Sequence, residues 1–165
     1  MTLDELNASD HGRFIEALGW VFEQSPWVAE RVWSRRPFAT RDDLYRAMVH
    51  EVQVAHMDEQ RVLLCAHPDL GTKARMSDAS VGEQASAGLD RLTPADYHRL
   101  KTLTAEYRER FGFPFLLAVK GKATQDIFDA LTARLYRSAD IEWREALAQV
   151  AGIAAFRLHD VVESE

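Results

Sequence analysis

Apolar residues return every three or four positions along most of the chain, which is the spacing that predicts amphipathic α-helices. Phe14, Leu18 and Phe22 form the first such stripe and predict an opening helix. Ser25-Pro26 is typical of a second helix start, with serine at the N-cap and proline in the first turn. Arg36-Pro37 ends that helix, because the residue before a proline avoids the helical conformation.

The next two helices are bounded by local signals of the same kind. Thr40 and Asp43 have the spacing of a capping box and open one helix. A further helix starts near Asp58 and must end near His67, because Pro68 follows.

The second half of the chain continues this pattern. A helix is predicted over 80–92, and its expected core face consists of Val81, Ala85, Leu89 and Leu92. Thr93-Pro94 opens a long helix, and Gly112 closes it as a C′ residue. Thr124 opens another helix, and the last one covers about 143–161.

Composition agrees with one globular domain. The chain has 165 residues, 47% of them hydrophobic and 28% charged, which is enough for a core of its own. No strand pattern competes with the helical one. The sequence therefore predicts an all-α protein, a single-domain bundle of about seven to eight helices over residues 1–165.

Charge and cysteine content exclude several classes of function. The net charge is −6 and the basic residues are scattered among acidic ones, which argues against a nucleic-acid partner. No apolar run is long enough to cross a membrane, and the N-terminus does not resemble a signal peptide. The single cysteine, Cys65, excludes an internal disulfide and fits a reducing compartment. We therefore expect a cytoplasmic protein.

The first candidate for chemistry is the corner Ala66-His67-Pro68-Asp69-Leu70-Gly71. Pro68 places the His67 imidazole at a helix end, where the imidazolium is favoured and a proton can be exchanged near neutral pH. The alternative is a histidine that only caps the last carbonyls of its own helix.

The second candidate is a polar strip on the helix predicted over 80–92. Ser80, Glu83, Gln84 and Ala87 share one face, opposite the predicted core face, and the small residues leave room for a ligand. Ser80 and Glu83 also have capping-box spacing, so the residues by themselves favour a cap and a solvated surface.

The third candidate is the segment Phe111-Gly112-Phe113-Pro114-Phe115-Leu116-Leu117-Ala118-Val119. Main-chain groups that follow a helix end lack regular partners, so they can bind a polar heterocycle inside a dry pocket. The alternative is plain core packing, which we expect for most of these side chains.

The fourth candidate is Arg157, which interrupts an apolar stretch of the last helix. Its guanidinium either extends to solvent along an apolar surface or forms a fork for a carboxylate or carbonyl. A zinc site is not predicted, since His50-Glu51 and His56 lack the one-turn spacing that zinc-protease helices need.

These pieces occur in an order that resembles the OHCU decarboxylase family, which acts in urate breakdown. The resemblance covers nearly the whole chain, and its further motifs are Phe22-Glu23-Gln24-Ser25-Pro26-Trp27, Arg36-Pro37-Phe38 and Ile153-Ala154-x-x-Arg157-Leu158. The resemblance implies an all-α homodimer, without metal or organic cofactor, whose partner is a small-molecule substrate. That substrate is 2-oxo-4-hydroxy-4-carboxy-5-ureidoimidazoline, abbreviated OHCU, and the implied product is (S)-allantoin.

The resemblance also implies roles for individual residues. His67 corresponds to the catalytic acid/base, and Glu83 lies close to the chemistry. The implied substrate-binding residues are Pro68, Ser80, Gln84, Phe115, Leu116, Leu117, Ala118, Val119 and Arg157. Two alternatives stay open: a helical interaction module without catalysis, and a decarboxylase of a related heterocyclic acid.

Overall fold

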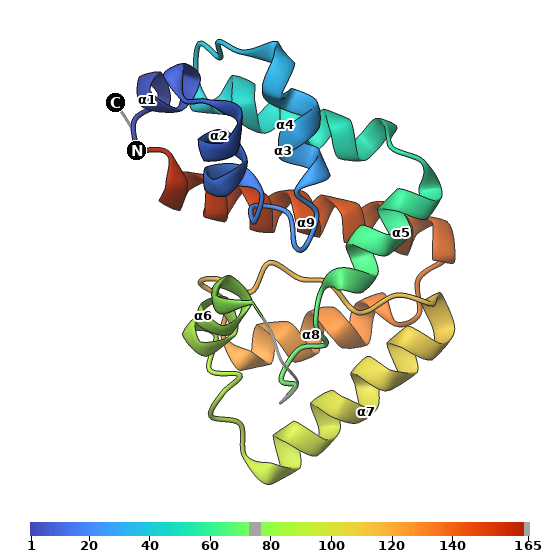
Figure 1. Cartoon of the computed structure of the whole chain (residues 1–165). Coiled ribbons are helices and arrows are strands. Elements are labelled where there is room, and N and C mark those ends of the chain that lie inside the picture. Colours follow the sequence, from blue (N-terminus) through green and yellow to red (C-terminus); the bar gives the residue numbers. More distant parts are fainter. Residues whose placement is uncertain (73–76, 164–165) are drawn as a thin grey trace. The chain divides into compact units, whose positions relative to one another are not determined.

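The chain is helical throughout the part that the structure describes. The computed structural model describes residues 1–72 and 77–163, and within these ranges it contains nine α-helices, one short 3-10 helix and no strand (Figure 1). The prediction of an all-α fold is confirmed. Two of the nine helices, α1 (Leu3–Ala8) and α3 (Trp27–Val32), have only six residues each, and α1 was not predicted.

Helix bounds follow the local signals in most places. The remaining elements are α2 (His11–Leu18), η1 (Trp33–Arg35), α4 (Arg41–Val54), α5 (Met57–Ala66), α6 (Asp78–Ser86), α7 (Pro94–Phe111), α8 (Thr124–Arg134) and α9 (Ala139–Val161). The opening helix was predicted to reach Phe22, but α2 ends at Leu18 and a turn follows. In the described residues, no helix is both long and apolar enough to cross a membrane.

The chain divides into two compact units. One unit comprises residues 1–63 and 150–165, and the other comprises 64–149. Helix α9 contributes to both, because its residues up to Gln149 belong to the second unit and those from Val150 belong to the first. The prediction of one domain over residues 1–165 stays a prediction.

In the first unit, α4 and the C-terminal part of α9 are joined by a side-chain contact. Thr40 caps α4 by accepting from the main-chain N–H of Asp43 at 3.0 Å, as predicted. The hydroxyl of Tyr45 donates to the carbonyl of Ala151 at 3.1 Å. Buried apolar residues of this unit include Phe14, Leu18, Val28, Leu44, Met48, Ala154 and Leu158.

In the second unit, α7 is the long helix, and its bounds are the predicted ones. The Thr93 hydroxyl accepts from the N–H of Asp96, Pro94 occupies the first turn, and Gly112 ends the helix at a φ of 77°. Glycine suits that left-handed position because it has no Cβ. The buried ring of Tyr107 packs against Phe115 with ring centres 5.3 Å apart. This helix therefore supports the segment that follows it.

Candidate functional site

The histidine corner lies where the sequence predicts it. Helix α5 ends at Ala66, and the N–H of His67 donates to the carbonyl of Leu64 at 3.3 Å. The His67 residue is only 5% exposed, so its imidazole belongs to the interior. A buried histidine beside a helix end has a restricted orientation, which a proton-transferring group needs.

Helix α6 begins and ends earlier than predicted. Its N-cap is Ser77, whose hydroxyl accepts from the N–H of Ser80, so the predicted cap at Ser80 is wrong. Both serines suit an N-cap, and the sequence alone does not separate them. The helix ends at Ser86 rather than at residue 92.

The burial of α6 also differs from the predicted core face, of which Leu89, beyond the helix end, is buried as predicted. Val81 was assigned to the core but is 47% exposed, whereas Ser80 and Gln84 are 5% and 6% exposed. Ala87 of the polar strip is buried, and Glu83 is half-buried. A helix normally buries its apolar side, so burial of the polar side indicates that these groups have partners or a ligand in the interior. The interpretation of a merely solvated strip is therefore wrong for Ser80 and Gln84.

One hydrogen bond joins the histidine corner to α6. The N–H of Gly71 donates to Oε1 of Gln84 at 2.9 Å. Gly71 has a φ of 70°, which other residues adopt only with strain, and a Cβ there would crowd Cδ2 of Leu100 at 2.7 Å. Two motifs that are separate in the sequence thus meet in the same unit.

The segment after α7 packs as expected, and its main chain has specific partners. The residues Phe115, Leu116, Leu117 and Val119 are all less than 9% exposed, so the expectation of core side chains is confirmed. The carbonyl of Leu116 accepts from Nη1 of Arg134 at 2.6 Å. The N–H of Ala118 donates to Oε1 of Gln149 at 2.9 Å.

A buried charged cluster next to this segment was missed by the sequence interpretation. Nε of Arg134 donates to Oε1 of Glu142 at 2.8 Å, and the Tyr107 hydroxyl donates to the same oxygen at 2.5 Å. Both charged residues are almost fully buried. Burial and the neighbouring Glu142 carboxylate raise the pKa of Tyr107 well above its ordinary value.

The sequence carried a signal for this cluster. Arg134 follows Ile127 and Leu131 at helical spacing, and Glu142 precedes Ala146 in the same way. Each charged residue therefore occupies a core position of its helix. The spacing identifies the burial, but it does not identify the partner.

Arg157 forms a fork rather than extending to solvent. Its Nη2 lies 2.9 Å from Oε2 of Glu23, and its Nη1 donates to the carbonyl of Trp20 at 3.3 Å. Both side chains of the pair are at most 3% exposed, so the interpretation of a solvent-reaching arginine is wrong. Arg157 and Glu23 belong to the first unit, whereas the other predicted site residues belong to the second. Glu23 had received no role from the sequence.

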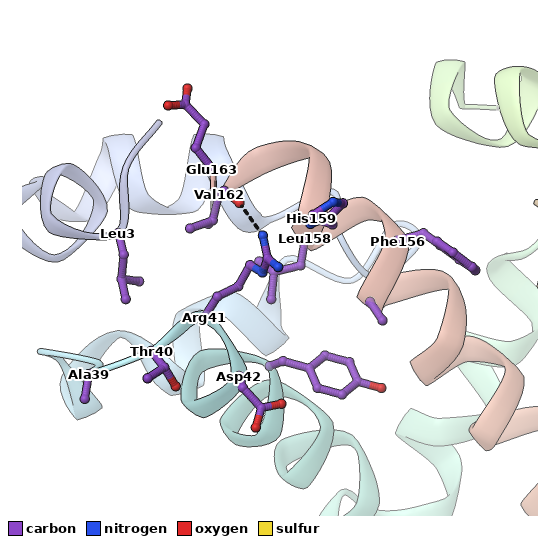
Figure 2. A pocket seen from close by; sticks show the side chains of 12 residues that line it. Leu3, Ala39, Thr40, Arg41, Asp42, Phe156, Leu158, His159, Val162 and Glu163 are labelled. Carbon is purple, nitrogen blue, oxygen red and sulfur yellow. Dashed lines mark hydrogen bonds between the residues drawn. The ribbon is translucent and has the colours of Figure 1, made fainter. Parts of the chain in front are cut away.

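Two pockets are found among the described residues, and the second borders the end of the histidine corner. A pocket of about 660 Å³ in the first unit is lined by α4 and the end of α9, where Arg41 donates to the carbonyl of Val162 at 2.9 Å (Figure 2). A second, of about 590 Å³, lies between Asp69–Thr72 and one face of α7. Neither is lined by His67, Glu83 or the Phe115–Val119 segment.

Two further observations concern the single cysteine and the possible metal ligands. The side chain of Cys65 is exposed, and its thiol lies 3.8 Å from the carbonyl of Gly112. Among the described residues, no group of three or more His, Cys, Asp or Glu side chains is placed to hold a metal ion.

Comparison with known proteins gives a consistent result over the whole chain. The family model for OHCU decarboxylase matches residues 7–159. The 2-oxo-4-hydroxy-4-carboxy-5-ureidoimidazoline decarboxylase of Halalkalicoccus jeotgali is 48% identical, over 98% of this chain and 92% of that protein. The protein of the same name from Haloferax volcanii is 46% identical, over 100% of this chain and 98% of that protein.

A solved structure agrees in fold. The crystal structure of an (S)-allantoin synthase matches with a TM-score of 0.82 and 30% identity, over 99% of this chain and 55% of that chain. The order of motifs, the helical fold and the family model all lead to one assignment: this chain belongs to the OHCU decarboxylase family.

Proposed function

We propose that this protein decarboxylates OHCU and releases (S)-allantoin and CO₂. The relatives that match over almost their whole length carry the name of this activity. The structural observation that carries the proposal is the inverted burial of α6, where Ser80 and Gln84 are buried and Val81 is exposed. A polar face turned into a helical protein is what a site for a hydrogen-bonding heterocycle requires.

The reaction breaks one carbon–carbon bond and makes one carbon–hydrogen bond. The carboxylate leaves as CO₂, and the electron pair of the broken bond stays on the ring carbon. The conjugated ring of the substrate delocalises this pair until a proton reaches the carbon. Delivery of the proton to one face makes the product (S). The protein therefore has to orient the ring, shelter it and supply that proton.

His67 is the proposed proton donor. It is buried beside the end of α5, which restricts the orientation of its imidazole. Glu83, on α6, is proposed to hydrogen-bond the ring hydroxyl or the imidazole and so to fix its orientation. A general acid contributes about 10²–10⁴-fold to a rate.

The remaining predicted residues are proposed to bind the substrate. Pro68 shapes the corner. The ureido and ring amides of the substrate are proposed to form hydrogen bonds with Ser80, Gln84 and the main chain of Phe115–Val119. Arg157 pairs with Glu23 in the first unit, and the substrate-binding role that the resemblance gives it stays a prediction. The hydrogen bond from Gly71 to Gln84 supports this grouping, because it holds the histidine corner against α6.

The decisive experiment forms the unstable substrate in place from urate, with the enzymes that act before this step, and follows allantoin by circular dichroism. The wild-type protein is expected to accelerate formation of the (S) enantiomer. His67→Asn is expected to lose about 10²–10⁴-fold in turnover while keeping its helical spectrum. A wild-type protein that leaves allantoin racemic, or a fully active His67→Asn, contradicts the proposal.

We also propose a cytoplasmic location and a homodimeric assembly. A cytoplasmic location is supported by the single cysteine of the sequence, which needs no oxidising compartment. A homodimer is the assembly that the family resemblance implies, and analytical ultracentrifugation tests it directly. A monomer at micromolar concentration contradicts the proposed dimer.

A further inference from the structure

We propose that Gln149 and Arg134 are positioning residues for the reaction. They hold the main chain of the Phe115–Val119 segment in the conformation that binds the substrate. This inference rests on the proposed function, because it explains how one of the proposed binding segments is held in place.

The segment has main-chain groups that no regular structure satisfies. Residues 114–119 belong to neither a helix nor a strand, and buried main-chain groups need hydrogen-bond partners. The carbonyl of Leu116 accepts from Arg134 at 2.6 Å, and the N–H of Ala118 donates to Gln149 at 2.9 Å. Two side chains thus provide main-chain hydrogen bonds that a neighbouring strand would provide in a sheet.

The two anchored residues alternate along the chain. In an extended chain, main-chain groups of alternate residues point to the same side, and those of the residue between them point to the other. The proposed binding edge is therefore formed by the N–H and C=O of Leu117, which lies between the two anchored residues. A donor and an acceptor on one edge match the N–H and C=O of a cyclic amide or a ureido group.

Both anchoring side chains are themselves fixed. Nε2 of Gln149 donates to Oε1 of Glu145 at 2.9 Å, which determines that the oxygen of its amide faces Ala118. Arg134 is fixed by Glu142 at 2.8 Å, and its guanidinium carbon lies 4.5 Å from the centre of the Phe115 ring. Glu145 thus fixes Gln149, and Glu142 fixes Arg134. Each of these two pairs holds one main-chain group of the segment.

The test compares Gln149→Ala with a matched control, Gln125→Ala. Gln125 is exposed on α8 and makes the same kind of one-turn hydrogen bond, to Asp129 at 2.8 Å. Gln149→Ala is expected to raise KM about three- to tenfold with kcat within about twofold, the pattern of a lost binding contribution. Amide hydrogen exchange at Ala118 is expected to accelerate about tenfold or more. Gln125→Ala is expected to change neither quantity.

A rescue variant separates positioning from general stability. Combining Glu145→Gln with Gln149→Glu exchanges the two side chains, so a carboxylate oxygen accepts from Ala118 and an amide donates to that carboxylate. This double variant is expected to return KM to within about twofold of wild type. If Gln149→Ala fails to fold, the double variant alone tests the positioning role. A double variant that folds but has a raised KM overturns the proposal.

The outcomes distinguish this inference from the function on which it rests. If the wild-type protein makes (S)-allantoin and Gln149→Ala keeps both KM and Ala118 exchange unchanged, the positioning role is overturned and the proposed function stands. If the wild-type protein makes no (S)-allantoin, the proposed function fails and the positioning role fails with it.

Discussion

Helices α6 and α7 belong to the same unit, but the sequence predicts the ends and buried face of α7 correctly and those of α6 incorrectly. Helix α7 begins at Pro94 and ends before Gly112, as its capping signals predict, and it buries Leu100 and Tyr107. Helix α6 buries Ser80 and Gln84 and exposes Val81. Helix α7 thus follows the ordinary rule of an apolar interior face, whereas the proposed site uses the polar interior face of α6. Substitutions in the two helices should therefore change different properties.

The largest expected effect is on turnover, in α6. Glu83→Gln keeps the size of the side chain but removes its charge, so turnover is expected to fall about 10²–10⁴-fold with little change in stability. The matched control is Glu106→Gln, at an exposed position of α7, for which wild-type turnover is expected. Steady-state kinetics of both variants measure the contrast. Equal turnover in the two variants would mean that the polar strip of α6 takes no part in the reaction.

The next effect is on stability, in α7, and depends on pH. Burial and the Glu142 carboxylate raise the folded-state pKa of Tyr107 above its ordinary value of 10. The stability that the folded protein gains from this raised pKa is fully present below pH 10. It is lost progressively above pH 10, because there the unfolded chain releases the Tyr107 proton and the folded chain keeps it. Each pH unit above 10 is expected to lower the free energy of unfolding by about 1.4 kcal/mol through this group.

Urea unfolding of wild type and Tyr107→Phe between pH 9 and 11 measures that slope. The phenylalanine variant has no ionisable group at this position, so its stability should fall less steeply over the same range. Parallel pH curves for the two proteins would show that Tyr107 titrates alike in the folded and unfolded states.

The smallest effect is expected at the exposed apolar position of α6. Val81→Thr keeps the branched shape of the side chain, and at an exposed position it should change stability by about 0.5 kcal/mol or less. Turnover should also stay at the wild-type level. A loss of several kcal/mol would place Val81 in the core, as the periodicity of the sequence had predicted.

Local signals explain how much of the fold was predictable. Thr40, Thr93 and Gly112 act on their own helix ends, so the sequence places these ends without knowledge of the rest of the molecule. The start of α6 was misplaced because Ser77 and Ser80 both suit an N-cap. Its inward face was wrong because periodicity assigns apolar residues to the interior, and a polar interior face reverses that rule.

The site was predictable only as far as motif and resemblance reach. The sequence singles out His67 and Gln84 as candidates, but the hydrogen bond through Gly71 that joins their motifs depends on tertiary structure. The buried ion pairs were not predicted from the sequence for the same reason. Glu23 pairs with Arg157 from a distant part of the chain, and no local pattern identifies such a partner.

The central claim is that His67 and Glu83 act in one site, and a double-mutant cycle tests it most directly. Turnover is measured for His67→Asn, Glu83→Gln and the combined variant, with allantoin chirality as the readout. Residues that act as a unit are not additive, so the combined variant should be about as slow as the slower single variant. Losses that multiply in the combined variant would show that the two side chains act independently and would contradict the account.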